Sequence, residues 1–508
     1  MTVAGMPVSL AATPVPVGLD VLRRPDSSRP GDVAVDGPEG VYERRRRALS
    51  ASGVVPATRP WALVRVRTPA DVAEALGWAR RCGRPVSVRS GGHSLSFTAF
   101  REGAVVLDLS GLDSIEVDRG TRTARVGAGV TSLALAQALH TEGLAFPVGH
   151  KATVGLGGFL LAGGNGWNQG VWGSAAESIR AADVVLPGGP AGSAVAGPGT
   201  HRIDRTTDPE AFAALRGAGP GFPGVVTAFE LHLRPRPAVV RSVAVFDGRD
   251  VAEACAWADR LRESVPPEIE LTVYLAPRGG QHAHLTDGST VTVSATAFCA
   301  SPAAAETLAR QVLRGAPESA LRIDRAPTDI PSMLDAQTLP PGLGMAAQQA
   351  WTDTSYSTVV PPLLATVGAA PSAHNSVLVS SASYRRAEPP ARDMAYLPLG
   401  TITVAAYAAW APGQDDEANR AWPGQVLDAV RPWWAGHYVG ELDLRRTPEL
   451  LPSCFRPGVL DSIAAVRARL DPDGLVAGPL ETRADRSVAG SAGQPLGVTE
   501  GPPHPQAS

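Results

Sequence analysis

Alternating apolar and polar positions predict a series of strands and helices from residue 61 onwards. Residues 61–67 alternate as a strand does. Residues 68–71, Thr-Pro-Ala-Asp, then carry three signals of a helix start: a threonine cap, a proline at the first position and an acid in the first turn. The apolar stripe behind them has helical spacing and ends at Gly83, and residues 85–89 form a second predicted strand.

The same pattern divides the rest of the chain. Further strands are predicted at 105–109, 114–117, 122–126, 179–186, 225–233, 271–275, 290–297, 376–381 and 401–410, and helices at 131–143, 209–216, 250–262, 303–314 and 460–470. Prolines and composition suggest five segments: an arm (1–54), a first domain (55–237), a second domain (238–430), a C-terminal segment (431–480) and a disordered tail (481–508). No internal repeat is present.

Composition excludes several classes of protein. The 508 residues are 44% hydrophobic, enough for a buried core, and the net charge of −3 gives no broad basic face for nucleic acid. No apolar run is long enough to span a membrane, and no secretory or twin-arginine signal is present. The four cysteines are far apart, so we expect no metal site and no disulfide framework, and a cytoplasmic location.

The chain has 46 basic residues, and Lys151 is the only lysine among them. Codon bias in a GC-rich genome explains the general depletion of lysine. It does not explain why one lysine remains at position 151.

Two glycine-rich segments are the candidates for binding a ligand. Residues 89–94, Arg-Ser-Gly-Gly-His-Ser, follow a predicted strand, and their adjacent glycines can present backbone N–H groups to a pyrophosphate. Such a turn is common, and a lone histidine is more often structural. Residues 155–166 form a second cluster that matches neither the Rossmann fingerprint nor a P-loop. Close helix packing through glycine is the alternative interpretation of this cluster.

These segments, taken in order, resemble a known family. The loop at 86–94, the runs Leu-Asp-Leu-Ser (107–110) and Ala-Arg-Val-Gly-Ala-Gly (124–129), the second loop at 147–167, and residues 181–186, 215–219 and 224–227 resemble the PCMH-type FAD-binding domain of the vanillyl-alcohol-oxidase-like flavoproteins. The berberine-bridge-enzyme-like branch is the most similar one. The resemblance covers about 55–237, with a weaker part from 438 to 475.

The resemblance implies a fold and a cofactor. The fold is α+β, with a PCMH-type FAD-binding domain of two subdomains and a substrate domain made of an antiparallel sheet with covering helices. The implied FAD-binding residues are Arg89, Ser90, Gly91, Gly92, His93 and Ser94; Gly149, Thr153, Val154, Gly155, Gly158, Gly163, Gly166 and Trp167; and Ile179, Val225 and Tyr438.

His93 matches the family histidine that bonds to the flavin 8α-methyl carbon, so the resemblance implies covalent FAD. Lys151 departs from the family, because many members have a cysteine there that makes a second flavin bond. We therefore expect a single attachment. Lys151 could stabilise an anionic reduced flavin or substrate, or act as a base if burial lowers its pKa; the alternative is an exposed or salt-bridged lysine.

The substrate side departs further from the family. The predicted strand 401–410 has no carboxylate, and Ala405 stands where the family usually has Glu or Gln. Tyr407 and Tyr438 are the substitute catalytic candidates, each with a structural role as the alternative. The family's Tyr-x-Asn reads Tyr-Val-Gly at 438–440, and Val154 lies at a position that gates oxygen in some relatives.

The sequence thus predicts an FAD-dependent oxidoreductase. It would transfer hydride from a C–H bond of an alcohol, sugar or secondary metabolite to flavin N5, with O₂ as the acceptor and a base taking the proton. A non-redox cyclase or isomerase on the same scaffold, and a flavin-free binding protein, are the alternatives. The sequence assigns neither the substrate nor the oligomeric state.

Overall fold

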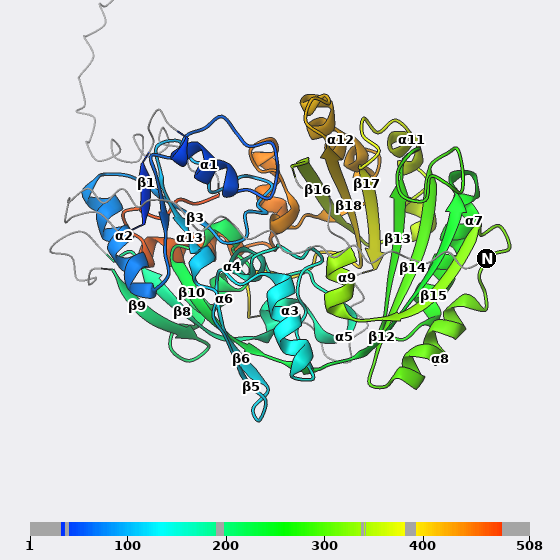
Figure 1. Cartoon of the computed structure of the whole chain (residues 1–508), viewed down its shortest axis with the longest axis horizontal. Coiled ribbons are helices and arrows are strands. Elements are labelled where there is room, and N and C mark those ends of the chain that lie inside the picture. The colour runs from blue at the N-terminus through cyan, green and yellow to red at the C-terminus, as the bar shows by residue number, and fades with distance from the viewer. Residues whose placement is uncertain are drawn as a thin grey trace, which may run out of the picture.

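A computed structural model describes residues 32–35, 40–188, 198–336, 340, 342–381 and 393–479. It confirms the α+β class, with a helix-rich first part beside a large antiparallel sheet (Figure 1). Most of the predicted arm, residues 189–197 and the predicted tail 481–508 lie outside the described residues. No helix within the described residues is long and apolar enough to cross a membrane.

The first part opens with a four-stranded sheet. Its order is β1 (Val33–Val35), β2 (Ala62–Arg65), β4 (Val105–Asp108) and β3 (Val86–Arg89), with β2, β4 and β3 parallel. Helix α1 (Val41–Ala48) precedes β2, and α2 (Pro69–Arg81) follows it. Thr68 caps α2 in a reciprocal capping box with Asp71, as the sequence predicts.

A five-stranded antiparallel sheet follows. Its order is β5 (Ile115–Asp118), β6 (Thr123–Gly127), β10 (Val225–His232), β8 (Ile179–Leu186) and β9 (Gly199–Asp204). Helix α3 (Ser132–Thr141) leaves β6 through the Thr131 cap, and α6 (Pro209–Leu215) leads to β10.

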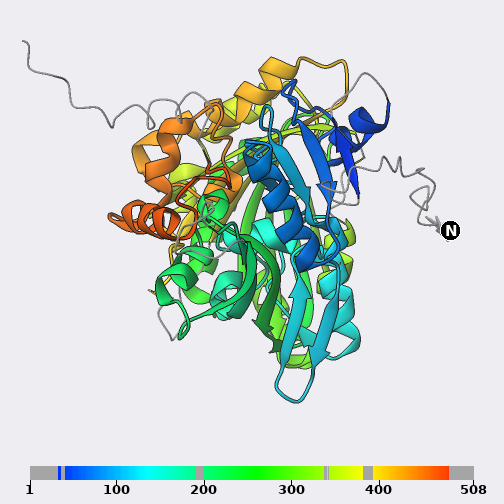
Figure 2. The same cartoon turned by 90° about the vertical axis from the view of Figure 1, so that its left-hand side faces the viewer.

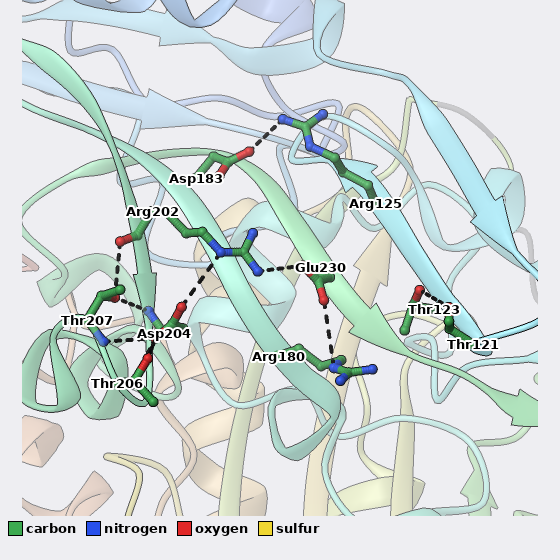
Figure 3. Close-up of polar contacts among 10 residues, drawn as sticks. All are labelled: Thr121, Thr123, Arg125, Arg180, Asp183, Arg202, Asp204, Thr206, Thr207 and Glu230. Carbon is green, nitrogen blue, oxygen red and sulfur yellow. Dashed lines mark hydrogen bonds and ion pairs between the residues drawn. The ribbon is translucent and has the colours of Figure 1, made fainter.

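One face of this sheet carries a ladder of ion pairs (Figure 3). Arg125 lies 2.5 Å from Asp183, and Glu230 lies between Arg202 (2.6 Å) and Arg180 (3.7 Å). These side chains are partly exposed, so each pair stabilises the fold by only about 1 kcal/mol or less. The ladder keeps a solvent-facing sheet polar and has no evident part in the chemistry.

The second part is an eight-stranded antiparallel sheet. Its order is β15 (Arg322–Thr328), β12 (Ala238–Asp247), β14 (Thr290–Cys299), β13 (Ile269–Ala276), β17 (Ser376–Ser381), β18 (Ile402–Trp410), β16 (Gly344–Thr352) and β19 (Trp434–Gly436). The covering helices include α7 (Val251–Ser264), α8 (Pro302–Leu313), α11 (Leu363–Gly368) and α12 (Asp416–Asp428). Figure 1 shows α7 and α8 on the outer side of the sheet.

The two faces of this sheet differ in chemistry. Valine, leucine and alanine from the central strands fill one face and pack under the helices. The register places a polar row on the opposite face, running across four strands through Ser294, Thr272, Ser380 and Thr403. Because side chains alternate along a strand, residues an even number of positions from this row lie on the same face of the sheet. Tyr407, four positions after Thr403, is one of them. A polar, partly buried sheet face is therefore directed toward the first part.

The chain finally returns to the first part. Helix α13 (Val459–Leu470) lies beside α6 (Figure 2). Arg469 of this helix pairs with Asp208 at 2.8 Å. Buried residues from Tyr438 to Val476 belong to the hydrophobic core of the first part. Segment 438–444 consequently lies between the two parts, where it can reach both.

Candidate active site

The two glycine loops, about 60 residues apart in sequence, are in direct contact. An ideal Cβ on Gly155 would lie 2.2 Å from Gly91 N, and one on Gly91 would lie 2.1 Å from Gly155 N. Gly155 has φ −79°, which any residue can adopt, so glycine is required here by the close approach alone. The neighbouring Ser90 hydroxyl donates to the Ala128 carbonyl at 2.6 Å, and the Gly157 N–H donates to the same carbonyl at 3.0 Å, so both loops contact the residue that follows β6.

The remaining glycines of the second segment serve different purposes. Gly163 packs against the Tyr396 ring and Gly166 against the Pro147 carbonyl, so close packing explains both. A Cβ on Gly158, in α4 (Leu156–Leu161), would meet no atom within 4 Å. The segment therefore combines a packing role with one backbone face that a ligand can approach.

His93 lies at the junction of the two loops. Its Nε2 is 2.8 Å from Thr153 Oγ1 on the opposite loop. Burial lowers its pKa to about 4, helped by the positive charges of Arg89 and Lys151. Arg89 itself pairs with Asp108 at 3.0 Å. His93 is therefore a neutral imidazole at physiological pH, as a nucleophile requires.

Lys151 begins the turn that ends at Val154, whose N–H donates to the Lys151 carbonyl at 3.2 Å. Its side chain is half-buried, and burial lowers its pKa. Because its charge also lowers the pKa of His93, the two side chains share one environment. The lysine is therefore near enough to the histidine for its charge to act on it, and its predicted role toward the flavin stays a prediction.

The residue before it, His150, was missed by the sequence reasoning. Its ring packs against Trp167 with centroids 4.3 Å apart, and Nε2 lies 3.7 Å from Glu270 Oε1. Glu270 comes from β13 on the polar sheet face and also accepts the Asn168 N–H at 2.8 Å. These contacts join the second loop to the large sheet, and no local motif signals them.

Tyr438 is buried, and its hydroxyl accepts the Gly164 N–H at 3.2 Å. A Cβ on Gly440 would lie 2.7 Å from the Tyr438 ring. The Tyr438 ring, as it lies here, therefore fills the space that a side chain at 440 would need. The geometry supports a structural role for Tyr438 more than a catalytic one.

Tyr407 lies half-buried on the polar face of β18 (Ile402–Trp410), directly opposite Ala347 on one neighbouring strand and Ser376 on the other. Its hydroxyl donates to Glu441 Oε1 at 2.9 Å. Burial raises the pKa of both groups, and the contact with Tyr407 together with nearby His150 partly offsets the rise at Glu441. The strand has no carboxylate, as expected, but the C-terminal segment supplies one.

The other predicted cofactor residues are distributed around this centre. Ser94 accepts from Thr98, Gly149 packs on the Phe159 ring, and Gly92 adopts a positive φ of 77°. Ile179 and Val225 are buried at the starts of two strands, so any contact they make with a ligand would come from the backbone. The described residues hold no group of three or more His, Cys, Asp or Glu that could bind a metal ion.

Both loops lie inside a segment that matches a known protein family. A family described as an FAD binding domain matches residues 60–191. Residues 60–191 therefore form an FAD-binding domain. This match confirms the FAD-binding part of the predicted resemblance for residues 60–191.

Curated relatives match this FAD-binding domain and its surroundings. The chain is 33% identical over 241 residues (47% of this chain, 51% of the relative) to the FAD-linked oxidoreductase janO of Penicillium janthinellum. It is 36% identical over 182 residues (35% and 37%) to (R)-6-hydroxynicotine oxidase of Paenarthrobacter nicotinovorans. The chain thus matches about half the length of such relatives, or less.

Solved structures show the same fold over most of the chain. Crystalline 6-hydroxy-D-nicotine oxidase from Arthrobacter nicotinovorans has a TM-score of 0.71 at 23% identity, covering 88% of this chain and 96% of that one. Berberine bridge enzyme from Eschscholzia californica has a TM-score of 0.73 at 17% identity, with the same coverage. The FAD-binding domain and the large sheet therefore occur together in proteins of known structure.

Proposed function

We propose that this protein is an FAD-dependent oxidoreductase that oxidises a small organic molecule. The observation that carries the proposal is His93, a neutral imidazole held at the contact of two glycine loops inside an FAD-binding domain. The polar sheet face directed at these loops supplies hydrogen-bonding groups for a substrate. Nothing in the structure or the comparisons favours the non-redox alternative.

The residues present fit FAD. The loop at 89–94 and the turn at 153–158 would hold it, with N–H groups for the pyrophosphate and the accessible backbone at Gly158. FAD supplies a two-electron acceptor for the substrate hydride. The protein would orient the substrate, exclude water and manage the proton.

We further propose that FAD is attached covalently through His93 alone. Thr153 Oγ1 can accept the Nε2 proton at 2.8 Å, which would leave the Nδ1 lone pair as the nucleophile. Lys151 stands where relatives have cysteine and offers no thiol. Its ammonium would favour negative charge on a reduced flavin or a substrate.

The partner molecules are proposed at the level of class. The neighbours' names point to a cyclic amine, an alkaloid or an oligosaccharide: 6-hydroxy-D-nicotine oxidase, berberine bridge enzyme and chitooligosaccharide oxidase. Val154 is compatible with O₂ as electron acceptor. The four cysteines are all free thiols, which supports a reducing, cytoplasmic location.

Acid precipitation of the purified protein tests the attachment. Wild type should keep its yellow colour in the pellet, and denatured protein on a gel should show flavin fluorescence. His93→Ala should release all its flavin to the supernatant. His201→Ala, an exposed change on β9, is the matched control and should behave as wild type. Wild type that releases its flavin would refute covalent attachment.

Anaerobic mixing tests the reaction class. We expect the flavin absorbance to bleach with at least one of 6-hydroxynicotine, reticuline or chitotriose, and to return when O₂ is admitted. Bleaching without recovery in air would indicate a dehydrogenase. Product formation without any bleaching would overturn oxidoreduction.

A further inference from the structure

Two side chains from distant parts of the chain meet at the edge of the candidate site. Tyr407 comes from the polar face of β18, and Glu441 comes from a short 3-10 turn at Val439–Glu441. The Tyr407 hydroxyl lies 2.9 Å from Glu441 Oε1 and donates to it. Both side chains are half-buried, so neither is sealed in a core.

The backbone holds this carboxylate in a fixed position. The Glu441 N–H donates to the Tyr438 carbonyl at 3.0 Å. On the other side, the buried Ser96 hydroxyl donates to the Leu442 carbonyl (2.8 Å) and accepts the Leu444 N–H (2.9 Å). The segment just after Glu441 is therefore tied to the FAD-binding domain through Ser96, while Glu441 itself is held in a local turn.

Three titratable groups around the pair come from three different segments of the chain. Tyr438 lies on the same segment, Tyr274 comes from β13, and His150 comes from the second glycine loop. His150 directly precedes Lys151, which shares the environment of His93. The pair thus stands on the same side of the sheet as the loops that would hold FAD.

Two other oxygen groups near the site already accept backbone hydrogen bonds. Tyr438 uses its hydroxyl to accept the Gly164 N–H. Glu270 accepts the Asn168 N–H and lies beside His150. Ala405, where the family usually has a polar residue, cannot take a proton. Tyr407 and Glu441 form a hydroxyl–carboxylate pair joined by a hydrogen bond, and both side chains are partly exposed.

We propose that Tyr407 and Glu441 form the proton-accepting relay of this enzyme. The inference rests on the proposed function. As the substrate C–H hydride leaves for FAD, the substrate O–H or N–H bond breaks and its proton passes to Tyr407 Oη. The Tyr407 proton passes at the same time to Glu441 Oε1. Tyr407 is regenerated, a C=O or C=N bond forms, and one proton rests on Glu441 until it reaches solvent.

The chemistry suits these groups. A phenol alone is a poor proton acceptor, but a phenol that gives its proton to a carboxylate can accept one in the same step. General-base catalysis typically contributes about 10²–10⁴-fold to a rate. The carboxylate of Glu441 therefore replaces the family's absent carboxylate from a different segment of the chain.

Flavin reduction measured by anaerobic stopped flow tests the relay, with the reducing member of the three-compound panel as substrate. Glu441→Gln should slow reduction by about 10²–10⁴-fold, and Glu441→Asp should restore part of the rate. The wild-type rate should rise with pH as the relay carboxyl ionises, and this rise should be lost in Glu441→Gln. The double variant with Tyr407→Phe should be no slower than the slower single variant, because the two groups act as a unit.

A titration without substrate separates the relay from the proposed function. The flavin absorbance of wild type should show a pH transition that Glu441→Gln abolishes. Glu449→Gln, an exposed change on the same segment, is the matched control and should keep it. If no panel compound reduces wild-type flavin, the proposed substrate classes fail while this titration still decides the relay. A Glu441→Gln variant with wild-type titration, or with wild-type rates and pH profile, would overturn the relay.

Discussion

The contact between the two glycine loops makes a sharp prediction about Gly155. Alanine at this position would place its Cβ 2.2 Å from Gly91 N and 2.3 Å from Ser90 Oγ. Atoms in ordinary contact lie about 3.5 Å apart, so the loops must separate by roughly 1.3 Å. The backbone torsion of Gly155 is open to alanine, so the collision is the only objection to the change.

The magnitude follows from what can move. Gly91 N is a backbone atom inside a turn and cannot rotate away. The loss of folding stability should therefore lie at the upper end of the range for overpacked cores, about 3 kcal/mol. For a domain of this size each kcal/mol lowers Tm by about 2–4 °C, which gives a drop of roughly 6–12 °C. The displaced His93 loop should also bind less flavin.

Thermal melting and flavin absorbance per protein would measure both effects. Gly424→Ala is the matched control, because Gly424 lies inside α12 and its Cβ would meet no atom within 4 Å. That change should stabilise the protein by about 0.5–1 kcal/mol through helix propensity. A Gly155→Ala protein that melts as wild type does, with full flavin content, would refute the proposed packing of the two loops.

Two further predictions concern stability. Ser96→Ala leaves two buried backbone groups at 442–444 without their partner, so it should lower the free energy of unfolding by about 1–3 kcal/mol; an unchanged denaturant midpoint would contradict this role of Ser96. Arg249 and Thr286 hold the pKa of Asp247 at about 2, below its ordinary 3.8. The stability that this carboxylate contributes is present above about pH 4 and is lost as pH falls toward 2. Asp247→Asn should flatten the acid limb of a plot of Tm against pH, and an unaltered limb would argue against this linkage.

Local chemistry in the sequence determined many of the elements. Thr68 and Thr131 cap the helices that they were expected to begin, and the strands at 179–186 and 376–381 have the predicted bounds. These signals work because capping and alternation act between neighbours a few residues apart.

Other elements are determined by their surroundings. Strand β16 (Gly344–Thr352) is rich in alanine and glutamine and gave no strand signal, yet it pairs along its whole length with β18. Helix α12 contains Pro423 but is fixed by its packing on the sheet. Tertiary packing overrides local propensity in both cases.

The residues of the candidate site also fall into those that local sequence indicates and those that only tertiary packing brings together. The motif order alone pointed to the two loops, His93 and Lys151, because a ligand-binding loop needs a particular run of residues. His150, Glu270 and Glu441 carry no such signature. Glu441 meets Tyr407 only because the C-terminal segment docks between the FAD-binding domain and the polar face of the sheet. The sequence by itself therefore determined the FAD-binding segment with its glycine loops, whereas only the tertiary structure brought Glu441 to Tyr407, because that contact joins residues with no local relation.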